Sequence, residues 1–194
     1  MSAGSVTNVF LAGVGGQGIL RAAEIIARAA LVAGYQVKTN EIHGMAQRGG
    51  SVVAQIRYGP EVHSPLIAEG TAQVLGALEQ IEAIRYAHYL APGGLAVVSG
   101  QSIIPVTVST GGAKYPQDVK DRLGRLFSRL VYLDAPKAAL EAGNIQAANT
   151  VILGAMSGGL DLPPSAWMEA INTCLPEKHR GVNVRAFEAG RAWV

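Results

Sequence analysis

Short apolar runs and segments with helical spacing alternate along most of the chain. The first run, from Val9 to Ala12, has no polar alternation, which is typical of a strand covered on both faces. Apolar residues then recur with helical spacing from about Gln17 to Ala33. The same patterns predict further strands at 35–40, 51–58, 73–78, 95–99 and 130–133, helices at 79–90 and 116–126, a helix capped by Asp134, and a short extended piece at 106–108.

The order of these elements predicts the fold class. Strands alternating with helices indicate an α/β protein with three layers (α/β/α) around a mainly parallel sheet. The run 51–58 alternates, so we expect a half-buried strand with Gln55 and Arg57 on its polar face. From Asn144 onward the pattern is helical only, at 145–156, 165–174 and 182–192. With no linker or repeat, residues 1–194 are predicted to form a single domain.

A glycine-rich turn joins the first strand to the first helix. Gly13, Gly15 and Gly18 match the pattern G-x-G-x-x-G, in which glycine allows the tight turn and lets an anionic ligand approach the backbone. Free N–H groups and the positive dipole end at the start of a helix favour phosphate or carboxylate. The candidate ligand-binding residues here are therefore Gly13, Gly15, Gly16, Gln17 and Gly18.

The turn alone does not predict a dinucleotide. A dinucleotide site also has an acidic residue about 20 positions further on, for the ribose hydroxyl. Lys38 stands there and Glu41 is the nearest acid, although Lys38 could meet a ribose phosphate. A phosphate-binding P-loop is excluded, because Ile19 and Leu20 follow Gly18 where Lys and Ser or Thr are required. A turn used only for close helix–strand packing stays open as an alternative.

The segment from Glu41 to Gly50 is the second candidate site. It has no sustained period and carries the side chains of Glu41, His43 and Arg48, followed by Gly49 and Gly50. An arginine beside two glycines offers a fixed fork for phosphate or carboxylate next to an approachable backbone. Arg48 could equally satisfy helix-end carbonyls at a subunit contact. Because this loop also follows a strand, it could share one sheet edge with the glycine turn.

Composition and charge narrow the possible partners. The chain is 49% hydrophobic and only 15% charged, so we expect a partner, including a second copy of this chain, to cover part of its surface. A net charge of +2 without a basic run argues against nucleic acid. No apolar run reaches the roughly 20 residues that span a bilayer, and the start does not resemble a signal peptide. The sequence thus predicts a cytoplasmic protein without a membrane partner.

Cysteine and histidine usage argues against redox chemistry within this chain. Cys174 is the only cysteine, so a disulfide or an iron–sulfur cluster held by this chain alone is excluded. Its apolar neighbours predict a buried structural thiol. The four histidines lack metal-ligand spacing, and no catalytic nucleophile stands out. We therefore expect no metal, no cofactor and no catalytic residue in this chain alone.

Several segments together resemble the gamma-type subunit of 2-oxoacid:ferredoxin oxidoreductases, in the branch that acts on indolepyruvate. The similarity covers nearly the whole chain, and the segment His43 to Gly50 (HGMAQRGG) is its most specific part. Two positions depart from the family pattern, Gln73 in place of an aspartate and Ser99-Gly100 in place of an asparagine. The segments that carry the resemblance are 9–18, 41–52, Leu78-Glu79, Glu82-Ala83, Pro92-Gly93-Gly94, Asn183 and Ala186-Phe187.

The resemblance implies a function within a complex. Such complexes decarboxylate a 2-oxoacid on thiamine diphosphate, pass electrons through iron–sulfur clusters to ferredoxin and release an acyl-CoA. The catalytic partner subunit would hold thiamine diphosphate and the clusters, and CoA would be a co-substrate. This chain would be the non-cluster subunit, inactive alone, lending the glycine turn and Arg48 to the CoA or active-site side. The alternatives are a free-standing nucleotide-binding oxidoreductase and an assembly scaffold without a ligand site.

Overall fold

The computed structural model describes residues 5–44, 49–104 and 114–194, and within these residues six strands form one sheet. The strand order is β2-β3-β1-β4-β5-β6. Strands β1, β4, β5 and β6 pair in parallel, whereas β3 runs antiparallel between β2 and β1. The strands are β1 (Thr7–Val14), β2 (Gln36–His43), β3 (Ser51–Gly59), β4 (Ala72–Ala77), β5 (Leu90–Ser99) and β6 (Leu130–Leu133).

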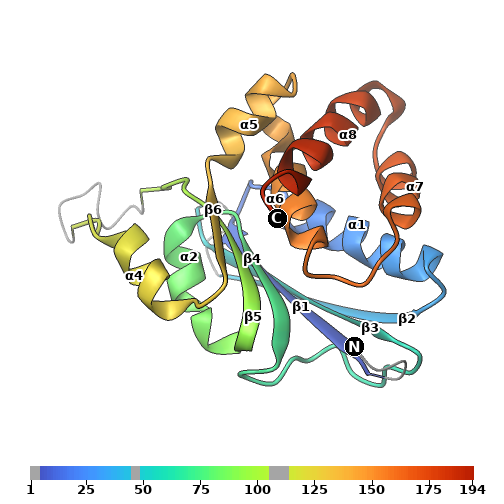
Figure 1. Ribbon diagram of the computed structural model, residues 1–194, viewed down its shortest axis with the longest axis horizontal. Coiled ribbons are helices and arrows are strands. Elements are labelled where there is room, and N and C mark those ends of the chain that lie inside the picture. Colours follow the sequence, from blue (N-terminus) through green and yellow to red (C-terminus); the bar gives the residue numbers. More distant parts are fainter. Residues whose placement is uncertain (1–4, 45–48, 105–113) are drawn as a thin grey trace.

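Helices cover both faces of the sheet, which confirms the predicted α/β fold with a mainly parallel sheet (Figure 1). On one face lie α1 (Ile19–Val32), α5 (Ala135–Glu141), α6 (Ala148–Ser157), α7 (Pro164–Cys174) and α8 (Glu177–Arg191). The other face carries α2 (Gln80–Arg85) and α4 (Val119–Leu126). Two short 3₁₀ helices, η1 (Ala87–Tyr89) and η2 (Ile145–Ala147), precede β5 and α6. No helix of the described residues is long and apolar enough to cross a membrane.

The central strand β1 divides the core into two parts. All eight of its residues are buried, as the apolar run without alternation predicts. Val9 and Leu11 pack on the side of α1 and α6, and Phe10 and Ala12 pack on the side of α2 and α4. Because β1 lies between β3 and β4, its carboxyl end is at the centre of one edge of the sheet.

Helices α6 and α8 approach so closely that their backbones meet. A Cβ atom added at Gly154 would lie 2.0 Å from the carbonyl oxygen of Phe187, and one added at Gly190 would lie 1.9 Å from that of Val151. Such distances leave no room for any side chain, so glycine is required at both positions. This contact holds the helical C-terminal part against the sheet.

Strand β3 is more buried than its alternating pattern predicts. Gln55 is only 4% exposed, and its side-chain oxygen accepts the backbone N–H of Ile67 at 2.6 Å. Arg57 donates to the carbonyl of Ser64 at 2.8 Å. The segment 60–71 thus crosses the face that was expected to meet solvent, and the polar side chains of β3 bind its backbone.

Several element boundaries differ from the sequence prediction. Strand β2 runs on to His43, because pairing with β3 extends it beyond Asn40. Strand β5 begins at Leu90 and includes Pro92-Gly93-Gly94, which was expected to separate two elements. Helix α2 accordingly ends at Arg85, α4 begins at Val119, and α8 begins five residues before Val182, at Glu177. The extended piece expected at 106–108 lies outside the described residues.

Candidate functional site

The glycine turn leads from β1 directly into α1. Gly16 and Gly18 have φ angles of 100° and 78°, a left-handed conformation that L-amino acids with side chains rarely adopt. Gly18 is the N-cap of α1 and offers no side chain to its first-turn N–H groups. The N–H groups of Ile19, Leu20 and Arg21 have no acceptor within the helix. They can therefore bind an anionic group placed beside Gly16.

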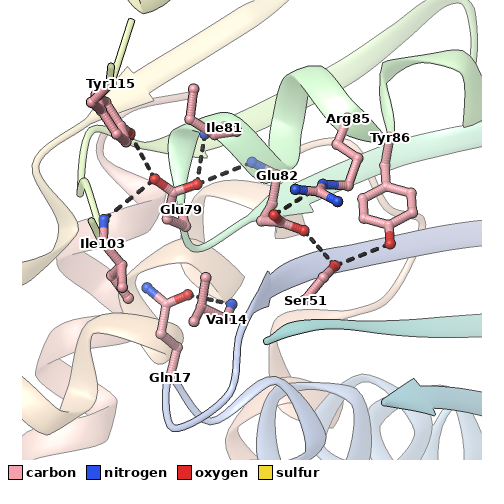
Figure 2. A network of polar contacts seen from close by, with 10 residues as sticks. All are labelled: Val14, Gln17, Ser51, Glu79, Ile81, Glu82, Arg85, Tyr86, Ile103 and Tyr115. Carbon is pink, nitrogen blue, oxygen red and sulfur yellow. Dashed lines mark hydrogen bonds and ion pairs between the residues drawn. The ribbon is translucent and has the colours of Figure 1, made fainter. Parts of the chain in front are cut away.

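Two candidate residues of the turn, Gln17 and Gly13, stabilise its conformation through contacts within the protein. The Gln17 side chain accepts the N–H of Val14 at 2.8 Å (Figure 2). It also donates to the carbonyl of Leu78 at 2.7 Å and to Gln101 Oε1 at 2.9 Å. A Cβ added at Gly13 would lie 2.7 Å from Ile19 Cδ1. The Gln17 amide thus fixes the turn to the end of β4, and Gly13 allows close helix packing.

The second glycine loop meets the first at the same sheet edge, as expected because each loop follows a strand. The N–H of Gly15 donates to the carbonyl oxygen of Gly50 at 2.9 Å. Gly49 has a φ of 73°, and the N–H of Gly44 donates to the carbonyl of Ser51 at 2.9 Å. Arg48 lies outside the described residues, together with residues 45–47, so the structure does not place its guanidinium.

A groove of about 880 Å³ lies between the start of α1 and the end of β2. Glu41 and His43 line it from β2, so both belong to a strand and not to the loop in which the sequence pattern placed them. Arg21 and Glu24 line the opposite wall and form an ion pair at 2.6 Å. The groove is lined by Val14, Gly15, Gly16, Gly18, Ile19, Leu20, Arg21, Glu24, Glu41, His43, Gly44 and Val52.

A second, smaller cavity of about 350 Å³ adjoins the same turn on the side of β4 and β5. Gly16 and Gly18 line both spaces, and Asn149 of α6 donates to the carbonyl of Gly18 at 3.2 Å. An added Cβ at Gly18 would lie 2.7 Å from the Asn149 amide nitrogen, so the Asn149 side chain would have to shift to admit it. The turn is therefore the point that the two spaces share.

The dinucleotide alternative meets a geometric obstacle. Strand β3 lies between β1 and β2, so Lys38 and Glu41 stand two strand spacings, about 9.6 Å, from β1. Because side chains alternate along a strand, Lys38 also lies on the opposite face of β2 from Glu41 and His43. Lys38 therefore faces away from the groove.

Two buried acidic residues at the start of α2 stood out in the sequence only within the family resemblance. Glu79 and Glu82 are 2% and 4% exposed. Glu79 accepts the N–H groups of Ile81 and Glu82 at 2.7 and 3.0 Å, and the hydroxyl of Tyr115 at 2.8 Å (Figure 2). Burial raises the pKa of Tyr115 above its ordinary value, which extends the pH range over which its hydroxyl can donate to Glu79. The sequence signal that could have indicated Glu79 and Glu82 is the presence of acidic residues directly after a buried strand.

Cys174 is less buried than the sequence suggests. It ends α7 with intermediate exposure, and its Sγ lies 4.0 Å from the carbonyl oxygen of Glu24. Burial raises the pKa of its thiol, so the unreactive protonated form predominates at neutral pH. Among the residues that the structure describes, no three His, Cys, Asp or Glu side chains are grouped to hold a metal ion.

Fold and geometry together define an α/β protein whose candidate ligand-binding edge is a glycine turn at a helix start, bonded to a second glycine loop. Comparison with known proteins identifies the family. The chain belongs to the pyruvate ferredoxin/flavodoxin oxidoreductase family, whose pattern matches residues 8–193. This confirms the resemblance found in the sequence motifs.

Individual relatives agree with this membership. The chain is 44% identical over 188 residues to the indolepyruvate oxidoreductase subunit IorB of Thermococcus kodakarensis, covering 94% of this chain and 93% of the relative. The pyruvate oxidoreductase subunit PORC of Thermotoga maritima has the same fold, with a TM-score of 0.71, 22% identity and coverage of 97% and 96%. A 2-oxoglutarate:ferredoxin oxidoreductase of Magnetococcus marinus, with 2-oxoglutarate, coenzyme A and succinyl-CoA bound, matches with a TM-score of 0.72 and 22% identity. This match covers 97% of this chain and 31% of that one.

Proposed function

We propose that this chain is the non-cluster subunit of a 2-oxoacid:ferredoxin oxidoreductase that acts on indolepyruvate or another aryl pyruvate. The observation that carries the proposal is the 44% identity to an indolepyruvate oxidoreductase subunit across nearly the full length of both chains. The complex would decarboxylate its substrate oxidatively, form an acyl-CoA and pass electrons to ferredoxin. Thiamine diphosphate and the iron–sulfur clusters would be held by the catalytic partner subunit.

The share of this chain would be to bind and orient an anionic group of CoA or of the 2-oxoacid. The first-turn N–H groups of α1 and the backbone of Gly16 and Gly18 supply donors and close access, whereas the N–H of Gly15 is already bonded to Gly50. The carboxylate of Glu41 disfavours an anion beside the end of β2, whereas that of Glu24 is paired with Arg21, so an anion is best received at the glycine turn. A groove of about 880 Å³ is large enough to take part of a CoA molecule.

Two alternatives remain distinguishable by experiment. A free-standing nucleotide-binding oxidoreductase is disfavoured by the position of β3 between β1 and β2. The observation that supports a pure assembly scaffold is the set of internal contacts of Gln17 and Gly13. In that case the turn serves only to pack α1 against the sheet. We place the complex in the cytoplasm, because a single cysteine leaves no internal disulfide of the kind found in oxidising compartments.

Activity should depend on the partner subunit. The purified chain is expected to be colourless, inactive with pyruvate or aryl pyruvates, and to bind NAD(P) no tighter than about 1 mM. Coexpression with a subunit that carries thiamine diphosphate and iron–sulfur clusters should yield a complex that reduces ferredoxin with aryl pyruvates. Assays on a panel of 2-oxoacids and calorimetry with NAD(P) check this. Micromolar NAD(P) binding, or a complex inactive with every 2-oxoacid tested, would contradict the proposal.

The isolated chain is also expected to self-associate, most simply as a dimer. Large apolar side chains such as Leu31, Leu140 and Trp193 are more than half exposed, and a partner would cover some of this surface. Light scattering at about 50 μM should give about twice the chain mass of 20.2 kDa. A monomeric mass at that concentration would refute self-association and leave the subunit function untouched.

A further inference from the structure

Helix α2 places a second buried carboxylate where helix capping does not explain it. Glu79 caps the helix, whereas Glu82 lies within the helix and its side chain points toward the first residue of β3 (Figure 2). Glu82 Oε2 accepts the hydroxyl of Ser51 at 2.5 Å, and Glu82 Oε1 forms an ion pair with Arg85 Nε at 3.1 Å. The Tyr86 hydroxyl lies 3.0 Å from Ser51 Oγ. Glu82 and Tyr86 thus hold Ser51 from two sides.

Ser51 stands at the junction of the two glycine loops. It pairs with Val14 at the end of β1, and the residue before it, Gly50, accepts the N–H of Gly15 through its carbonyl. Whatever fixes Ser51 therefore fixes the Gly50 carbonyl against the turn. The opposite side of the turn is fixed by Gln17, which binds Leu78.

A carboxylate at this buried position is energetically costly. Burying a charge is unfavourable unless it is paired and hydrogen-bonded, and Glu82 satisfies this with Arg85 and Ser51. In return, a charge-assisted hydrogen bond is roughly twice as strong as a neutral one and more restrictive in geometry. The Ser51 hydroxyl is consequently held more firmly than a neutral acceptor would hold it.

We propose that Glu82 is a positioning residue for the glycine turn: through Ser51 it holds Gly50 against Gly15 and so sets the backbone that receives the anionic group. The proposal rests on the proposed function, since CoA or the 2-oxoacid supplies that group. Its first part, the fixing of Gly15 by way of Ser51, concerns the chain itself and can be measured without activity.

Hydrogen exchange on the full chain tests the first part. Glu82→Gln and Ser51→Ala should speed exchange of the Gly15 amide about tenfold, because the hydrogen bond to Gly50 opens more often. Tyr86→Phe should give a smaller increase. Tyr89→Phe is the matched control, since its ring stacks on Phe10 but lies outside the contacts of Ser51. Unchanged exchange at Gly15 in both Glu82→Gln and Ser51→Ala would overturn the proposal, as would an equal increase in Tyr89→Phe.

Kinetics of the assembled complex test the second part. Glu82→Gln and Ser51→Ala should raise KM for CoA or for the 2-oxoacid about fivefold to tenfold, with kcat within about twofold of wild type. Ser51→Thr, which keeps the hydroxyl, should restore KM. Unchanged KM for both substrates would overturn the positioning role. A wild-type complex inactive with every 2-oxoacid would instead refute the proposed function, and the exchange data would still decide whether Glu82 fixes the turn.

Discussion

Replacement of Gly190 by alanine is expected to lower the free energy of unfolding by about 3 kcal/mol or more. The added Cβ would lie 1.9 Å from the carbonyl oxygen of Val151 and 3.0 Å from the backbone nitrogen of Ala155. Both atoms belong to the backbone of α6, so no side-chain rotation relieves the overlap and the two helices must separate. For a chain of this size the melting temperature should fall by about 6–12 °C.

Gly181→Ala in the same helix is the matched control. An added Cβ there would lie 3.7 Å from the Arg185 guanidinium, an ordinary contact. Alanine in a helix interior is favoured over glycine by roughly 0.5–1 kcal/mol, so Gly181→Ala should be neutral or slightly stabilising. Thermal denaturation of the two variants side by side measures the difference. A Gly190→Ala variant as stable as wild type would show that α6 and α8 are not in backbone contact.

In the assembled complex, Arg48→Ala is expected to lower kcat/KM about tenfold or more while assembly is retained. The prediction rests on the sequence pattern Arg48-Gly49-Gly50, because Arg48 lies outside the described residues. A charge-assisted contact to an anionic group of CoA or substrate is worth roughly 1.5–3 kcal/mol. Arg48→Lys keeps the charge but loses the bidentate fork, so its kcat/KM should fall between those of wild type and Arg48→Ala.

Gel filtration and kinetics on the same samples separate the two possible roles of Arg48. If Arg48 is an interface residue, Arg48→Ala should impair assembly first, and the surviving complex should have normal kinetics. Arg125→Ala removes an exposed arginine from α4, on the face of the sheet opposite α1, and should change neither measurement. Intact assembly with unchanged kinetics in Arg48→Ala would exclude both roles.

The sequence predicted the parts of the fold that depend on neighbouring residues. The local sequence pattern predicts β1, the glycine turn and the start of α1 to within a few positions. Asp134 caps α5 as expected. The burial of β3 could not be read in this way, since Gln55 is covered by the irregular segment 60–71, which folds back over the strand it follows. Likewise the extension of β2 to His43 depends on pairing with β3.

The candidate site, like the fold, has contacts that the sequence pattern predicts and contacts that it does not. The approach of the two glycine loops was expected because each loop follows a strand, and the bond between Gly15 and Gly50 confirms it. The contacts of Gln17 with Leu78 and Gln101 join residues 61 and 84 positions apart, and no local pattern indicates them. Glu82 was noticed only within a family motif. Its bond to Ser51 depends on tertiary packing that spacing does not encode.

The antiparallel return of β3 beside β2 has a consequence for how such a site can diversify. Strands β2 and β3 are hydrogen-bonded neighbours from Gln36 to His43, so the connection between them is a hairpin and not a crossover that spans the sheet. A hairpin loop can gain, lose or exchange residues without displacing the strands it joins. The glycine turn, by contrast, is tied into the centre of the sheet. The hairpin is therefore expected to tolerate sequence changes that the glycine turn does not.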